Sequence, residues 1–420
     1  MPACHSAFDQ WAALYVELGV GSSQSPTTVG VWGSSHWGNA ADARWSGLEP
    51  QWGDVSGRVM DVAITRGRVR WTDRIGASTA QVTCDNADGW LTWNRTAVTA
   101  QQVRVGSPVR VWAMTPDGVH HDLWRGFLES VADDYKPYER PAATLSCEDA
   151  LAQLGHVDLP EGPVVGASER TDQRIARVLD AADWPKQWRT LATGQVTVQG
   201  TNLARNLADE AGITADSEGG AVYAGVNGNV VFQNRDWLRL ADYAQNVQAV
   251  IGPGGAVCGS EHRVTIDGGD ILNDVQMGRA GGTALRVVNQ DSIARYRRRT
   301  YQRTDLVCET DAQVQLLAQR LLDARSPASV RLTDVTVPVV DQASATFVCT
   351  VAYGWRLHVT WSDPDSTETW TREVLVMGMT HRITPGGWEL TLAVDDATLL
   401  AAASAWGSGK WGTAKWTEAS

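Results

Sequence analysis

The amino-acid sequence predicts a mainly β protein with an α+β insertion, in which two β-barrel or sandwich modules flank a small α+β region. Three observations support this fold class. Apolar and polar residues alternate near both ends of the chain, helix-like periodicity replaces that alternation in the middle, and the two alternating stretches resemble each other. The chain has 420 residues, of which 43% are apolar and 20% charged. It is therefore long enough for several domains and too apolar to be disordered.

The changes of pattern divide the chain into five predicted parts. The outer two are arms rich in Trp and Gly, and the inner three are the first β module, the α+β insertion and the second β module. In chain order, the predicted boundaries are 1–57, 58–155, 156–268, 269–400 and 401–420.

The first module is predicted from residues that alternate with a period of two. Ala80, Val82 and Cys84 are separated by polar residues, as in a strand with one buried face. Turn-forming clusters at 85–89 and 115–118 separate the predicted elements. Further strands are expected at 59–64, 109–112, 123–128 and 143–147, and a short helix at 148–154.

Two helices and a hairpin are predicted between residues 160 and 268. Thr171 can cap a helix that Pro185 ends. Thr201 can cap a second helix, with Gly212 at its C-terminal end. The pair Asn227-Gly228 lies between two apolar runs and predicts a tight β-hairpin.

The second module is predicted from one helix and four strands. Thr310 and Gln313 form a capping box, and Val314, Leu317 and Leu321 share a face of the helix that follows. This helix is expected to end near residue 324. Strands are expected at 334–338, 355–361, 373–377 and 388–394.

The two strand sets carry a faint repeat. Residues 109–112 match 357–361, and residues 124–128 match 372–376. The segment Leu-Ser-Cys-Glu-Asp-Ala at 145–150 matches Leu-Ala-Val-Asp-Asp-Ala at 392–397, with similar spacing to the earlier strands. The repeat predicts two similar modules, although a shared β pattern without duplication would also give low-identity matches of this kind.

A second repeat links the two arms. Residues 32–40 and 406–414 both read Trp-Gly-Ser-x-x-Trp-Gly-x-Ala. Trp residues in Gly-rich segments cannot form a core by themselves, so they are expected to pack on a neighbouring subunit or on the body of their own chain. The candidate interaction residues are Trp32, Trp37, Trp45, Trp406, Trp411 and Trp416.

Charge argues against a general nucleic-acid binder, because the chain has a net charge of −12. One basic run, Arg295, Arg297, Arg298 and Arg299, stands out against this background. It could line a pore or meet an acidic partner, and the alternative is a solvated strand face.

The sequence predicts neither a secretory signal nor a membrane anchor, because no basic-then-apolar leader or long apolar run is found. The six cysteines are too far apart for local metal or redox motifs. We therefore expect reduced, mostly buried thiols in a protein that folds in a cytoplasm.

Residues that could carry catalysis or hold a cofactor do not form a convincing set. The glycine-rich segment 252–259 lacks the last glycine of a dinucleotide fingerprint. His120 and His121 have no third ligand at metal spacing, and the acidic loop 363–368 would hold Ca²⁺ only weakly. The sequence thus predicts a protein that is not an enzyme and has no cofactor or metal.

Several segments resemble minor tail proteins of siphophages that infect actinobacteria. The similar segments, which follow one another in the same order, are 62–68, 84–86, 272–282, 291–296, 299–305 and 381–388. The resemblance implies a virion protein at the distal end of the tail, similar to baseplate hub proteins. Such hubs carry two tail-tube-like β-barrels around an insertion and usually form trimers, which present a pseudo-sixfold ring to the tail tube.

The resemblance also implies partners. These are further copies of the chain in a homotrimer, the distal tail ring, the tape measure and further minor tail proteins. Synthesis would occur in the host cytoplasm, and contact with DNA would be at most transient, during ejection. The alternative function is a carbohydrate-binding module for adsorption to the host wall, in which exposed Trp rings stack on sugars.

Overall fold

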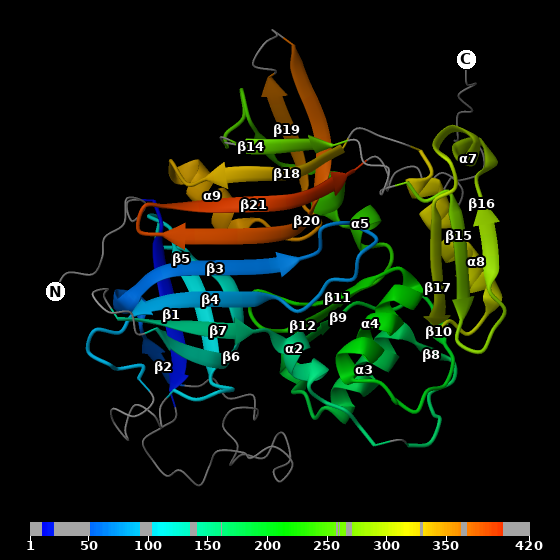
Figure 1. The fold of residues 1–420 in the computed structure, drawn as a ribbon, viewed down its shortest axis with the longest axis horizontal. Helices are drawn as coiled ribbons and strands as arrows, with labels where there is room; N and C mark the ends of the chain where they lie inside the picture. Colours follow the sequence, from blue (N-terminus) through cyan, green and yellow to red (C-terminus); the bar gives the residue numbers. More distant parts are fainter. Residues whose placement is uncertain are drawn as a thin grey trace.

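The computed structural model describes residues 11–20, 51–92, 103–134, 141–160, 162–257, 259, 261–265, 271–327, 331–362 and 368–397. Its main element is a sheet of 13 strands in the order β14-β18-β21-β20-β3-β4-β7-β6-β5-β1-β2, with β19 on β20 and β13 on β19 (Figure 1). The prediction of a mainly β protein is confirmed. Closed barrels are not found among the described strands, because the path of this sheet ends at β14 and at β2.

The first half of the large sheet is built from the N-terminal third of the chain. Its elements are β1 (Ala13–Val20), β2 (Gln51–Asp54), the short 3-10 helix η2 (Ser56–Arg58), β3 (Val59–Gly67), β4 (Thr79–Asp85), β5 (Pro108–Met114), β6 (His120–Asp134) and β7 (Ala142–Glu148). Strand β1 lies in the part predicted as an arm. Its Val16 and Leu18 are buried on either side of Glu17, a strand signal that the surrounding Gly and Trp residues obscured.

The second half of the large sheet comes mostly from the C-terminal third of the chain. Its elements are β13 (Val247–Ile251), β14 (Glu261–Thr265), β18 (Arg331–Pro338), α9 (Gln342–Thr350), β19 (Arg356–Ser362), β20 (Thr369–Thr384) and β21 (Gly387–Asp396). Strands β13 and β14 belong to the segment predicted as the insertion, yet they pair with β19 and β18.

The two halves are joined by main-chain pairing between β3 and β20. The antiparallel register runs from Gly67 opposite Gly378 to Val62 opposite Ile383. One hydrophobic core extends over both halves and includes Trp124 in the first and Trp388 in the second, each almost fully buried. The β modules are therefore one continuous structure.

The strand pairings of the two halves match the predicted repeat. Val111 of β5 lies opposite Trp124 of β6, and Val359 of β19 lies opposite Arg372 of β20, which are the pairs that the sequence match aligns. The pairings of β6 with β7 and of β20 with β21 also correspond. A bulge follows Leu128, which pairs with Cys147, and another bulge follows Val376, which pairs with Val394.

The first insertion is an α/β unit between the halves. Its elements are α2 (Ala150–Gly155), β8 (Glu169–Arg170), α3 (Thr171–Ala181), η3 (Lys186–Trp188), β9 (Arg189–Leu191), β10 (Thr197–Val198), α4 (Leu207–Glu218), β11 (Ala221–Ala224), β12 (Val230–Gln233), α5 (Trp237–Leu240) and α6 (Asp242–Gln245). The predicted hairpin at Asn227-Gly228 is confirmed by β11 and β12. Helix α3 begins after Arg170, so the predicted cap Thr171 is instead its first residue and is buried.

Helix α4 lies further along the chain than predicted. Asn206 caps it by accepting the backbone N–H of Asp209, and Gly219 ends it with φ at 76°. Thr201 therefore does not cap the helix, and Gly212 lies inside it. Either glycine could end a helix when judged from the sequence. Only Gly219 adopts the left-handed conformation, which glycine tolerates better than other residues.

A second inserted unit interrupts the second half between β14 and β18. It contains β15 (Asp274–Arg279), β16 (Leu285–Val288), α7 (Gln290–Tyr296), β17 (Thr300–Leu306) and α8 (Asp311–Arg325), and it has a hydrophobic core of its own. Figure 1 shows it at one side of the molecule, beyond the first insertion. The predicted helix with its capping box of Thr310 and Gln313 is confirmed as α8.

In the described residues, no helix has both the length and the apolar character needed to cross a membrane.

Candidate functional site

A pocket of about 130 Å³ lies where the large sheet and the two insertions meet. The sheet contributes the connection after β3, including Arg68 and Trp71. The first insertion contributes the end of α4 and helix α5, and the second insertion contributes Tyr301 of β17 and the last turns of α8. All three parts must be correctly placed for this pocket to exist.

The pocket combines apolar walls with a high density of charge. Trp237 and Leu238 of α5 are buried and form one wall, and Leu321 of α8 forms part of another. The charged lining residues are five arginines and four carboxylates: Arg68, Arg235, Arg239, Arg303, Arg320, Asp73, Asp216, Glu218 and Asp236. Such a lining suits the docking of a polar or aromatic group from another protein segment.

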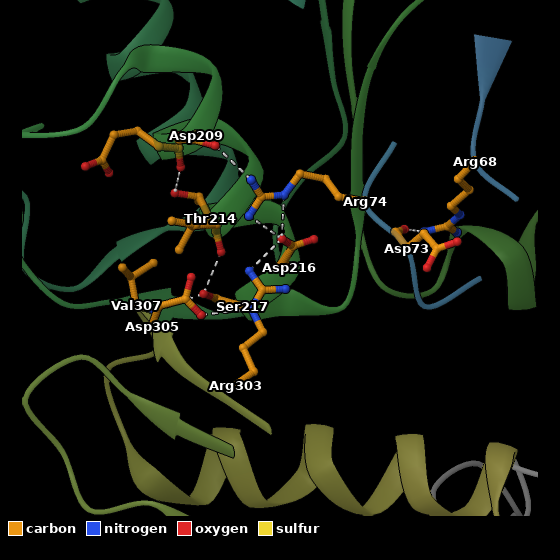
Figure 2. Close-up of polar contacts among 12 residues, drawn as sticks. Arg68, Asp73, Arg74, Asp209, Thr214, Asp216, Ser217, Arg303, Asp305 and Val307 are labelled. Carbon is orange, nitrogen blue, oxygen red and sulfur yellow. Dashed lines mark hydrogen bonds and ion pairs between the residues drawn. The ribbon is translucent and has the colours of Figure 1, made fainter. Parts of the chain in front are cut away.

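Asp216 of α4 is the centre of the polar network beside this pocket (Figure 2). Its Oδ2 accepts hydrogen bonds from Nε of Arg74 at 2.9 Å and from Nη2 of Arg303 at 2.7 Å. Arg74 follows β3, and Arg303 belongs to β17, so one carboxylate connects all three parts of the fold. Arg74 also reaches Asp209 at 3.0 Å, and Arg303 reaches Asp305 at 2.9 Å.

Ser217, the next residue, fixes α4 to the second insertion through main-chain groups. Its Oγ donates to the carbonyl of Ile213 at 2.7 Å and accepts the backbone N–H of Val307 at 2.9 Å (Figure 2). The thiol of Cys308 donates to the carbonyl of Ser217 at 3.2 Å. Both insertions are thus held together by bonds that do not depend on charge.

Burial and neighbouring charges shift the pKa values of three arginines that line the pocket. Burial lowers the pKa of Arg68 to about 10, against the opposing effect of Asp216. Burial and then Arg235 lower the pKa of Arg320. Burial also lowers the pKa of Arg303, but Asp216 and Asp305 outweigh it, so the pKa is raised overall. These guanidinium groups stay protonated at neutral pH and can bind anionic or π-rich groups.

A buried ion pair fixes the far side of the same junction. Asp395 of β21 accepts a hydrogen bond from Arg325 at the end of α8, and Arg331 lies 3.8 Å from its other oxygen. Asp395 also accepts the backbone N–H of Trp71 at 3.2 Å. Because Arg325 and Asp395 are both buried, this contact tolerates little change in position.

The predicted basic run does not line the pocket. Arg295, Arg297, Arg298 and Arg299 are all exposed on the second insertion, and Arg298 lies 3.6 Å from Asp274. Their backbone has a structural role that the charges did not suggest. The carbonyl of Arg297 and the N–H of Arg299 both bond to the side chain of buried Asn273.

The six candidate Trp residues, Trp32, Trp37, Trp45, Trp406, Trp411 and Trp416, lie outside the described residues, and so do positions 363–367 of the acidic loop. His120 lies 2.8 Å from Asp122, and His121 lies 3.1 Å from Thr115. Sequence reasoning missed the pocket, because its residues come from segments far apart in the chain and none carries a motif.

Comparison with known proteins gives a fold and no family. No protein-family model matches the chain, and no curated protein matches it. Among solved structures, it is similar to a tail protein from Neisseria meningitidis MC58, with a TM-score of 0.58 and 13% identity over 94% of this chain and 99% of that one. At this level of identity the likeness concerns the fold.

Two further structures share the architecture. The 43 kDa tail protein of prophage MuSo2 from Shewanella oneidensis aligns with a TM-score of 0.52 and 14% identity, over 83% of this chain and 96% of that one. A chain of the lidded PdpA-VgrG complex from Francisella aligns with a TM-score of 0.50 and 7% identity, over 93% of this chain and 53% of that one.

Proposed function

We propose that this chain is a structural protein of a phage tail, acting as a hub at the distal tip that continues or closes the tail tube. The observation that carries the proposal is the shared fold with a tail protein over nearly the full length of both chains. The predicted resemblance to minor tail proteins, made from other features, agrees with it.

The internal repeat supports a trimeric hub. The two halves of the large sheet have matching strand pairings, so one chain offers two similar units. Three copies would present six such units to a sixfold tube. A heterologous interface that closes after three copies gives a ring, which is the usual form of such assemblies.

Anchoring of neighbouring tail proteins is the second part of the proposed role. The two Trp segments are the candidate contacts, because large aromatic side chains dominate protein interfaces. The arginine-lined pocket is a further place for a partner segment to dock, since it has apolar walls and several guanidinium groups. The proposed partners are the distal tail ring, the tape measure and other minor tail proteins.

The test is the mass of the purified full chain in solution and the position of the protein in assembled particles. Native mass spectrometry should give three copies, and image reconstruction of tails should show one ring of the protein at the distal end. A stable monomer at micromolar concentration, together with absence from purified tails, would overturn the proposal.

A carbohydrate-binding function is the second candidate, and one observation favours it. Trp370 is 47% exposed and lies opposite Trp361 on the hairpin of β19 and β20. An exposed ring of this kind can stack on a sugar. Binding of host-wall glycan that is lost in Trp370→Ala, with assembly unchanged, would support adsorption over a purely structural role.

A further inference from the structure

Three side chains that can bind a metal converge where the first insertion leaves the large sheet. They are Glu129 of β6, Glu148 of β7 and His156, which follows α2. One ligand atom from each lies within 4.8 Å of the other two, and Nε2 of His156 is 3.8 Å from a carboxylate oxygen of Glu148. Glu148 lies 19 residues after Glu129, and His156 lies eight residues after Glu148, so no local motif reveals the three residues.

The sheet explains why the two glutamates meet. Leu128 and Cys147 pair across β6 and β7 and are both buried in the core, so Glu148, the next residue of β7, lies on the opposite face. The carboxylate of Glu129 reaches within 4.8 Å of that of Glu148. Glu129 is the extra residue of the bulge between Leu128 and Ser130. Bulges commonly re-aim a side chain next to a functional site.

His156 is held in position by a firmly anchored helix. Asp149 caps α2 by accepting the backbone N–H groups of Leu151 and Ala152. The same carboxylate accepts two hydrogen bonds of 2.6 Å from Ser78, one from its N–H and one from its hydroxyl. The backbone N–H of His156 closes the helix by bonding to carbonyls of the last turn. All three candidate ligands therefore project from rigid backbone.

The second feature of this cluster is the negative charge of its two glutamates. In the described part of the chain, the structure places no Arg or Lys in an ion pair with Glu129 or Glu148. Two like charges close together on one face of a sheet destabilise it. A bound cation would remove this repulsion.

The repeat supplies a comparison within the same molecule. Because Cys147 corresponds to Val394, Glu148 corresponds to Asp395. In the second half, Asp395 is neutralised by the buried Arg325. In the first half, the corresponding carboxylate faces a second carboxylate and an imidazole, which together form a set of metal ligands.

We propose that Glu129, Glu148 and His156 form a binding site for a divalent transition-metal ion, with Zn²⁺ as the best match. Zn²⁺ takes imidazole nitrogen and carboxylate oxygen at about 2.0–2.2 Å, and three protein ligands leave one position for water or a partner residue. The ion clamps α2, and with it the first insertion, to β6 and β7. This site does not depend on the proposed tail function.

Isothermal titration of the metal-stripped full chain with ZnCl₂ tests the proposal. One ion per chain should bind, and Glu129→Gln and His156→Ala should each weaken the affinity at least tenfold. His120→Ala is the control, since it removes another surface histidine that lies beside a carboxylate.

Absorption of the Co²⁺-substituted chain gives an independent readout. Wild type should show the visible bands of a low-coordinate nitrogen and oxygen site, and Glu129→Gln should lose them. Glu129→Gln keeps the size of the side chain, and metal-free unfolding curves check that it folds. Equal Zn²⁺ affinity in wild type and in both site variants, or no binding to wild type, would overturn the proposal.

Discussion

Replacement of Asp216 by Asn tests whether the polar network of Figure 2 holds the three parts of the fold together. The substitution keeps the size of the side chain and removes the charge that Arg74 and Arg303 share. Exposed ion pairs contribute about 0.2–1 kcal/mol, whereas breaking a buried pair costs about 3–5 kcal/mol. The side chain of Asp216 is 17% exposed and that of Arg303 20%, so an intermediate loss of about 2 kcal/mol is expected.

Asp209→Asn is the matched control. Asp209 lies on the same helix and binds the same Arg74, but its side chain is 50% exposed. Asp209→Asn should therefore lower the free energy of unfolding by less than about 1 kcal/mol. Urea unfolding followed by Trp fluorescence measures both, since Trp71 and Trp237 line the adjacent pocket. Equal losses in the two variants would refute the idea that Asp216 connects the three parts.

Three further predictions concern buried groups and backbone. Burial and then Arg66 lower the pKa of His381 to about 3, so the unfolded chain takes up a proton first as pH falls. The free energy of unfolding should therefore drop by about 1.4 kcal/mol per unit from pH 6.5 to pH 3 on account of this residue, and His381→Phe should remove that component. Gly252→Ala should destabilise the protein by at least about 2 kcal/mol more than Gly254→Ala. A Cβ at residue 252 would lie 1.9 Å from the carbonyl oxygen of Thr360, whereas a Cβ at residue 254 would have no atom within 4 Å. Similar melting curves for the two variants would contradict this prediction. Burial raises the pKa of Cys84 to about 11, so native protein at pH 8 should leave that thiol unlabelled by Ellman's reagent, as peptide mapping before and after denaturation would reveal.

The elements that the sequence predicts well are those defined by neighbouring residues. Helix α8 follows from a capping box and the periodic residues beside it, and the hairpin of β11 and β12 follows from Asn227-Gly228. The predicted start of α4 was wrong because Thr201 and Asn206 are both residue types that cap helices well, and tertiary packing decides between them.

The candidate site could not be predicted in the same way. Asp216 and Arg303 are separated by 87 residues, and each is an ordinary charged residue in its local sequence. Their contact arises because two insertions pack against each other, which no local pattern encodes. The sequence shows the repeat because corresponding strands of the two halves carry similar residues. It does not show that the two halves form one open sheet, because that depends on the pairing of β3 with β20, which are far apart in the chain.

The pairing of β3 with β20 has a consequence for biosynthesis. Strand β3 ends at Gly67, but β20 begins only at Thr369, about 300 residues later. At about 5–20 residues per second, translation exposes the unpaired edge of β3 for roughly 15–60 s. An unpaired strand edge is a template for aggregation. A nascent chain of this protein therefore depends on β20 to cover an edge that is made about 300 residues earlier, and ribosome stalling before residue 369 should leave an insoluble fragment.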